Sequence, residues 1–149
     1  MTTIQSTKIA KAKADQRQSI ISLLQSENLP TEDLPHSLDN FFVVLKGDGI
    51  VAAIGLEQYG NCGLLRSMVV KKEYRNRSIA SDLVKELESE AFALGIDCIY
   101  LLTETAPLYF EREGYKPVTR DETPEAIKAS SEFKNVCPVS AIVMKKSLN

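Results

Sequence analysis

Two arginines and several small residues lie in a short turn near the middle of the chain. Arg75 and Arg77 follow an apolar run that begins at Leu64, and apolar residues then recur at helical spacing at Ile79, Leu83, Leu87, Ala91 and Leu94. The first backbone N–H groups of a helix have no partner inside it, and the positive end of the helix dipole lies there. This pattern predicts a phosphate-binding turn, and the alternative for two arginines in a turn is plain exposure to solvent.

Arg66 is a charged residue inside the apolar run. Because a charged side chain is rarely buried without a partner, Arg66 must face solvent, a carboxylate or a substrate anion. Its planar guanidinium suits the carboxylate of an amino-acid-like molecule, or an arsinate or phosphinate group. We therefore treat Arg66 as a candidate substrate anchor, with an ion pair to Glu57 or another acid as an equal alternative.

The segments before the turn predict a meander of antiparallel strands. Residues 41–45 and 50–58 are apolar, with a turn by composition between them, and a second turn at 59–61 leads to the strand at Leu64. Residues 4–10 predict a further edge strand. Asp15 is a candidate N-cap for a helix that carries Ile20, Ile21, Leu23 and Leu24.

The segments after the turn predict a crossover. Gly95 is placed to end the long helix, and the apolar run 96–103 then predicts a strand parallel to the one at Leu64. A short helix at 107–113 before Gly114 and a strand at 115–118 follow. Thr123 is a candidate N-cap for a further helix, and residues 139–144 predict the last strand. The predicted fold is α/β: a mixed, mostly antiparallel twisted sheet with helices on both faces and a central parallel strand pair.

Length and composition predict one domain over residues 1–149. The net charge of −2 and the pI of about 5.5 give no global basic field for nucleic acid or an anionic membrane. No apolar run approaches the roughly 20 residues that span a bilayer, so we expect a cytoplasmic protein. The cysteines Cys62, Cys98 and Cys137 are odd in number and lack metal-type spacing, which favours reduced thiols and no metal site.

The order of these elements and two motifs resemble the GNAT family of acyl-CoA N-acyltransferases. The motifs are residues 67–84, a strand that leads through an Arg-x-x-small-x-small turn into a helix, and residues 106–115, a helix that ends in Gly-aromatic. More narrowly, residues 56–60 and 64–67, Glu132–Phe133 and Cys137–Pro138 are similar to the small acetyltransferases of arsenic-resistance operons. Thiolates bind trivalent arsenic, but the distance between the three cysteines along the chain argues against a shared site.

The resemblance implies acetyl-CoA as co-substrate. It implies that backbone groups of the strand at Met68, Val69 and Val70 pair with the pantetheine arm, while the turn surrounds the pyrophosphate with successive N–H groups. The residues that it assigns to the turn and the helix start are Arg75, Asn76, Arg77, Ser78, Ile79, Ala80 and Ser81.

Two positions depart from the family's pattern. Ser78 stands where the family usually has glycine, so its Cβ reduces the clearance for a phosphate, although its hydroxyl can donate to a phosphate oxygen. Phe110 stands where many relatives carry a tyrosine that reaches the thioester sulfur. Tyr109 lies one residue earlier, about 100° around the helix, so it is a candidate acid whose alternative is an ordinary core or rim aromatic.

Amine acylation needs a neutral amine, a polarised thioester and a proton for the departing thiolate. Glu57 and Glu104 are the carboxylates nearest to the acceptor side that the resemblance implies. Each is a candidate base acting through water, and the alternative is a solvated surface glutamate.

The sequence therefore predicts an acetyl-CoA-dependent N-acetyltransferase that acts on the primary amine of a small molecule, which is amino-acid-like and toxic on the narrower resemblance. The alternative is a non-catalytic acyl-CoA-binding or interaction module that has lost catalytic residues. We expect a small-molecule amine as partner, no nucleic acid and no membrane, with pairing into a homodimer as a further expectation.

Overall fold

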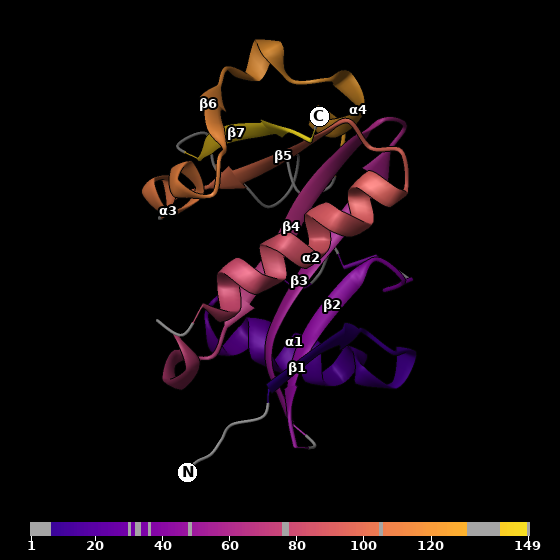
Figure 1. Cartoon of the computed structure of the whole chain (residues 1–149), viewed down its shortest axis with the longest axis vertical. Helices are drawn as coiled ribbons and strands as arrows, with labels where there is room; N and C mark the ends of the chain where they lie inside the picture. Colours follow the sequence, from indigo (N-terminus) through magenta and orange to yellow (C-terminus); the bar gives the residue numbers. More distant parts are fainter. Residues whose placement is uncertain are drawn as a thin grey trace. The chain divides into compact units, whose positions relative to one another are not determined.

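The computed structural model describes residues 7–29, 31, 34–35, 37–47, 49–75, 78–104, 106–130 and 141–148. These residues form a seven-stranded sheet in the order β1-β2-β3-β4-β5-β7-β6 (Figure 1). The strands are β1 (Thr7–Lys11), β2 (Phe41–Lys46), β3 (Gly49–Tyr59), β4 (Cys62–Val70), β5 (Cys98–Thr103), β6 (Lys116–Val118) and β7 (Ile142–Ser147).

Helices connect and flank these strands. They are α1 (Arg17–Ser26), α2 (Ile79–Ala93), α3 (Pro107–Arg112) and α4 (Glu125–Lys128), with 3-10 turns η1 (Ala14–Gln16), η2 (Lys72–Tyr74) and η3 (Arg120–Glu122). Gly95 and Gly114 follow α2 and α3 with φ angles of 82° and 101°, the left-handed conformation that glycine adopts without strain at a helix end. None of the described helices is long and apolar enough to cross a membrane.

The pairing confirms the predicted mixed sheet. β1 and β3 both run antiparallel to β2, and β5 and β6 both run antiparallel to β7. β4 and β5 are parallel, with Cys62–Leu64 in register with Cys98–Tyr100. The long helix α2 connects these two strands, as a strand–helix–strand crossover requires.

The chain divides into two compact units. The first unit comprises Met1–Gly55 and Ser67–Leu87, and the second comprises Leu56–Arg66 and Glu88–Asn149. The phosphate turn predicted from the sequence lies in the first unit. Glu57, Arg66, Glu104 and Tyr109 lie in the second.

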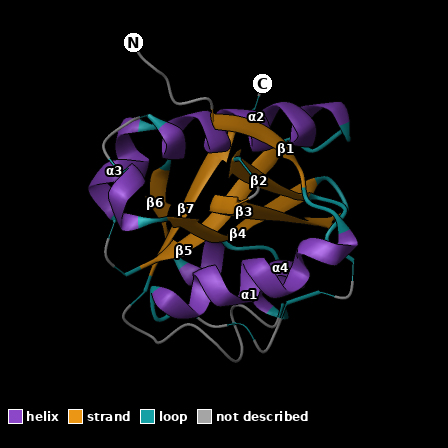
Figure 2. Cartoon of the chain, turned by 90° about the horizontal axis from the view of Figure 1, so that it is seen from below, coloured by secondary structure: helices purple, strands orange, loops and turns teal. Residues whose placement is uncertain are grey.

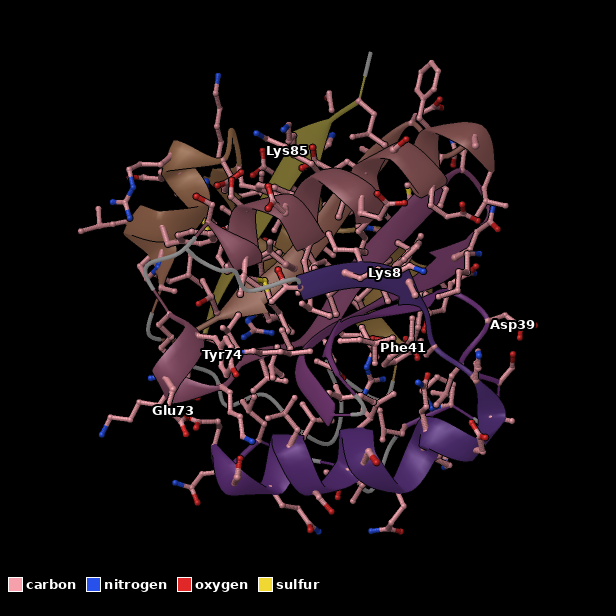
Figure 3. All side chains as sticks on the ribbon, turned by 60° about the horizontal axis from the view of Figure 1, so that its bottom comes forward. Lys8, Asp39, Phe41, Glu73, Tyr74 and Lys85 are labelled. Atoms are coloured by element: carbon pink, nitrogen blue, oxygen red, sulfur yellow. The ribbon has the colours of Figure 1, made fainter. Side chains whose placement is uncertain are left out.

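The core of the first unit joins α1 to the sheet. Ile20, Leu23 and Leu24 of α1 pack with buried residues of three strands, which are Phe41, Val43, Ala53 and Val69. Figure 2 shows the strands of this unit between α1 and the first half of α2. Phe41 lies on the α1 side of the strands (Figure 3), and its ring packs over Gly55, its partner in the register of β2 and β3.

The core of the second unit lies around the parallel strand pair. Leu64 of β4 and Tyr100 of β5 pack with Val143 of β7 and with Ile127, the buried residue of α4. Figure 1 shows β5 and β7 side by side, in agreement with their register.

Several predicted boundaries need correction. Asp15 does not cap a helix: it lies inside η1, where the Lys13 N–H donates to Gln16 Oε1 over 2.8 Å. Thr123 is not the N-cap of α4, because Pro124 takes that position and the Thr123 hydroxyl donates to the Thr119 carbonyl over 3.0 Å.

The first and last strands also extend further along the chain than predicted. β1 continues to Lys11, while residues 4–6 of the predicted strand lie outside the described residues. β7 continues through Lys145 and Lys146, which the sequence assigned to a tail, because both pair with neighbouring strands.

Candidate functional site

A backbone hydrogen bond and an ion pair hold the turn between β4 and α2. The Lys71 N–H donates to the Val51 carbonyl over 2.8 Å, and η2 follows. Arg75 Nε then donates to the Val70 carbonyl over 3.1 Å, while its Nη2 pairs with the carboxylate of Glu27, the C-cap of α1. The Arg75 guanidinium is therefore half exposed and held against its own turn. Figure 3 shows the neighbouring residues Glu73 and Tyr74 on this turn.

Ser78, the residue before α2, has an unusual backbone conformation. Its φ angle is 66°, in the left-handed region that favours glycine, and its carbonyl accepts a 2.9 Å hydrogen bond from the Asp82 N–H. The backbone N–H groups that follow, those of Ile79, Ala80 and Ser81, belong to the first turn of α2, at the positive end of the helix dipole. This places a left-handed residue and a helix start directly after the arginine turn. The predicted residues Asn76 and Arg77 lie outside the described residues.

The strand before the turn is mostly buried. Val69 and Val70 are buried and Met68 is half-buried, and Val69 packs into the α1 core. Ser67 has a φ angle of 55°, so the strand carries a left-handed residue immediately before Met68. The side chains of Val69 and Val70 are therefore core residues, and only backbone groups of this segment are candidates for a ligand.

In the second unit, β3 and β4 bring Glu57 and Arg66 together. Arg66 Nη1 donates to Glu57 Oε2 over 3.0 Å, and the side chains are 1% and 16% exposed. The Tyr59 hydroxyl donates to the other carboxylate oxygen, Oε1, over 2.8 Å. Glu57 is therefore held at both oxygens, and the ion pair is the alternative that the sequence left open for Arg66.

The environment of Tyr59 keeps its hydroxyl protonated. Burial is the main cause that raises the pKa of Tyr59 to about 12, and the hydrogen bond to Glu57 and the charge of that carboxylate add to it. Arg66 and a hydrogen bond with the buried Ser130 act in the opposite direction. Tyr59 is thus a hydrogen-bond donor to Glu57 at neutral pH.

Sequence reasoning missed Tyr59, which it assigned to a turn. The structure places Tyr59 at the end of β3, two residues after Glu57. Side chains two residues apart lie on the same face of a strand, so a strand extended by one residue would have predicted this neighbour.

Glu104 and Tyr109 flank the start of α3. Glu104 is exposed, while Thr103 is buried and its Oγ1 accepts a 3.0 Å hydrogen bond from the N–H of Ala106, the N-cap of α3. Tyr109 is half-buried with a buried hydroxyl oxygen, and its ring packs edge-on against Phe110 with 5.1 Å between centroids. The Tyr109 ring is thus part of the local packing of α3.

Comparisons with known proteins agree with this arrangement. Residues 37–117, more than half of the 149, match the model of the acetyltransferase (GNAT) domain. The amino-acid acetyltransferase of Pseudomonas syringae pv. tomato is 30% identical over 105 residues, which cover 69% of this chain and 24% of that protein. The corresponding protein of Pseudomonas fluorescens (strain Pf0-1) is 28% identical over 97 residues, which cover 64% of this chain and 22% of that protein. The chain therefore spans about a quarter of the length of these curated relatives.

Solved structures share the fold. N-acetylglutamate synthase from Neisseria gonorrhoeae, complexed with coenzyme A and N-acetyl-glutamate, has a TM-score of 0.83 at 15% identity, over 99% of this chain and 36% of that chain. A GNAT-family acetyltransferase of Staphylococcus aureus has a TM-score of 0.78 at 20% identity, over 97% of this chain and 100% of that chain. With the match over residues 37–117, these similarities establish that the chain belongs to the GNAT acetyltransferase family.

Proposed function

We propose that this protein transfers an acetyl group from acetyl-CoA to the primary amine of a small, amino-acid-like molecule. The observation that carries the proposal is the segment before α2, where the half-exposed Arg75 and a left-handed Ser78 follow β4 and η2. Family membership supports the reaction class. The similarity to proteins named amino-acid acetyltransferases supports the acceptor class.

The turn after β4 would hold the pyrophosphate of acetyl-CoA. The N–H groups of Ile79, Ala80 and Ser81 lie at the positive end of the α2 dipole, and a single interaction of this kind contributes about 0.3–1 kcal/mol. Several must therefore act together with Arg75, and with Asn76 and Arg77 as the sequence predicts. The positive φ of Ser78 fits this role, because the backbone there already has the conformation that glycine would take. Backbone groups of Met68, Val69 and Val70 would pair with the pantetheine amides.

Glu57 is the base candidate that the structure supports best. Its two oxygens are fixed by Tyr59 and Arg66, so the carboxylate is oriented before a substrate arrives. The exposed Glu104 remains a second candidate base, and Tyr109 a candidate acid for the leaving thiolate. Holding the amine beside the thioester supplies much of the rate enhancement, so acid–base help can be modest.

The ion pair changes the expectation for Arg66 as a substrate anchor. A substrate carboxylate would compete with Glu57 for a guanidinium that is almost fully buried. We therefore propose that Arg66 acts by positioning Glu57. Its role as an anchor for an anionic substrate stays a prediction that rests on the sequence.

Two assays test the proposal in order. Calorimetry with acetyl-CoA measures cofactor binding, and absence of heat at millimolar ligand would contradict the main claim. A thiol-release assay over a panel of amino acids then measures turnover. Glu57→Gln should lower kcat by about 100-fold or more, as expected for loss of a general base, while acetyl-CoA affinity stays unchanged. Glu111→Gln, on the exposed surface of α3, is the matched control.

The same assays decide the alternative, a non-catalytic acyl-CoA-binding module. That module would bind acetyl-CoA but release no thiol with any amine. A single domain over residues 1–149, pairing into a homodimer, a cytoplasmic location and the arsenic-resistance subtype stay predictions that rest on the sequence.

A further inference from the structure

Two cysteines stand opposite each other at the start of the parallel strand pair. Cys62 is the first residue of β4 and Cys98 the first of β5, and the two are direct partners in the register. Their sulfur atoms are 3.6 Å apart, and both thiols are free. The separation of these cysteines along the chain suggested no shared site, but the crossover through α2 brings them together.

One thiol is accessible and the other lies in the core. Cys62 is half-buried, whereas Cys98 is 9% exposed and packs among apolar residues that include Leu64 and Val143. Burial and the neighbouring Cys98 raise the pKa of the Cys62 thiol to about 11, so this group is a neutral thiol at pH 7. The Asn61 side chain accepts from the Cys62 thiol over 3.8 Å.

The distance between the two sulfur atoms favours some reactions of a dithiol over others. A disulfide needs about 2.05 Å, so the sulfurs would have to approach by about 1.5 Å within a hydrogen-bonded register. An atom that binds both sulfurs at about 2.3 Å would have a sulfur–atom–sulfur angle of about 100° when the sulfurs are 3.6 Å apart. A linear two-coordinate ion would need the sulfurs about 4.6 Å apart.

The bond angle fits a pyramidal or tetrahedral centre. Across the described stretches of the chain, no group of three or more His, Cys, Asp or Glu side chains could hold a metal ion, so the further donors of a tetrahedral metal are absent there. A trivalent pyramidal centre needs two sulfurs only, since it can bring its own third substituent.

We propose that Cys62 and Cys98 form a dithiol site for a soft, trivalent, thiophilic centre such as a monosubstituted arsenical. Two S–H bonds break and two arsenic–sulfur bonds form, while the oxide oxygen of the reagent leaves as water with the two thiol protons. Arsenic stays trivalent, so no oxidant or reductant is needed. The site is independent of the proposed acetyl transfer.

The test uses phenylarsine oxide on folded protein in a Cys137→Ser background, which leaves only these two cysteines. Intact mass should show one phenylarsenic group per chain, and thiol titration should show that two thiols are lost for each group bound. The melting temperature should rise, because the adduct links β4 to β5.

Single variants separate a chelate from ordinary thiol reactivity. Cys62→Ser and Cys98→Ala should each bind phenylarsine oxide at least about 100-fold more weakly, because the second bond of a chelate forms at a high effective concentration. Equal affinity in either variant would overturn the proposal, and so would folded Cys137→Ser protein that keeps both thiols. If Cys98→Ala does not fold, the half-buried Cys62→Ser and the thiol count still decide.

Discussion

At position 78 a serine adopts a φ angle of 66°, in the region where a Cβ meets the following carbonyl oxygen. That conformation costs a non-glycine residue roughly 1–2 kcal/mol. Glycine avoids this cost, but it loses more backbone entropy on folding, which offsets part of the gain. Ser78→Gly should therefore raise the free energy of unfolding by about 0.5–1 kcal/mol. It should also tighten acetyl-CoA binding, since the Cβ no longer limits the approach of a phosphate.

Urea unfolding and calorimetry measure these two effects of Ser78→Gly. Ser89→Gly is the control, because this exposed serine lies in the interior of α2 and glycine there should cost about 0.5 kcal/mol. Weaker acetyl-CoA binding in Ser78→Gly would mean that the serine hydroxyl is itself a phosphate ligand.

Arg66 and Glu57 stabilise the protein only as a pair. Arg66→Met removes the partner of a mostly buried carboxylate and should lower the free energy of unfolding by about 3 kcal/mol. Glu57→Leu combined with Arg66→Met should recover most of that loss, since an apolar pair leaves no uncompensated charge. Urea unfolding of the variants checks this, and a cost below about 1 kcal/mol for Arg66→Met would indicate that water reaches Glu57.

At the scale of elements, the pairing of β2 with β3 depends on a glycine. A Cβ at Gly55 would lie 2.4 Å from the Phe41 ring, which is fully buried. Gly55→Ala should therefore cost about 1–3 kcal/mol of stability, as overpacking does. Gly49→Ala in the same strand is the control, because a Cβ there meets only an ordinary 3.7 Å contact. Thermal melting compares the two, and equal melting temperatures would show that Phe41 can move aside.

The end of α1 is joined to the turn after β4 by the pair of Glu27 with Arg75. Because a phosphate would compete with this carboxylate, Glu27→Gln should tighten acetyl-CoA binding about two- to fivefold, the equivalent of an exposed ion pair. Calorimetry measures the change. Glu125→Gln, which breaks the exposed pair with Lys128, should leave the affinity unchanged. Weaker binding in Glu27→Gln would show that the pair instead holds the turn in its binding conformation.

At the scale of the whole molecule, Tyr59 links stability to alkaline pH. Its pKa of about 12 lies above the ordinary value of 10.0, so the folded protein binds more protons than the unfolded chain between these values. Its contribution is complete below pH 10 and is lost as pH rises to 12.

In Tyr59→Phe the free energy of unfolding should therefore fall less steeply as pH rises through this window. Part of the fall should remain, because the pKa values of Tyr100 and Tyr115 are also raised. Glu57→Gln should flatten it as well, because the carboxylate helps to raise the pKa of Tyr59. Urea unfolding at several pH values measures the slope, and an unchanged slope in both variants would contradict this assignment.

The fold could be predicted from the sequence because its signals are local and repeated. Apolar runs, the helical spacing after residue 78 and the glycines after α2 and α3 gave the elements, and the right-handed crossover rule gave the parallel pair. Boundaries failed where a side chain had two possible roles. Thr123 bonds backward to Thr119 rather than capping α4. The lysines of β7 resemble a tail, although both pair with β5 and Lys145 also pairs with β6.

The site was only partly predictable, since side-chain partners depend on register and rotamer. The sequence indicated Arg66 and Glu57 separately, but not that they form a pair or that Tyr59 completes it. It indicated the turn at Arg75, but Glu27 lies 48 residues away along the chain. The contact of Cys62 with Cys98 was missed for the same reason.

The border between the two compact units runs through regular elements. It passes between Gly55 and Leu56 in β3, between Arg66 and Ser67 in β4, and between Leu87 and Glu88 in α2. Each unit is therefore assembled from separate stretches of chain, and no single cleavage or truncation can release either one intact. A fragment that keeps the arginine turn but loses residues before Gly55 would also lose Phe41, Val43 and Ala53, which pack in one core cluster with Val69 of β4. Neither unit can therefore be produced as one continuous fragment of the chain. Deleting a continuous segment will remove parts of both units and will not assign a function to either one.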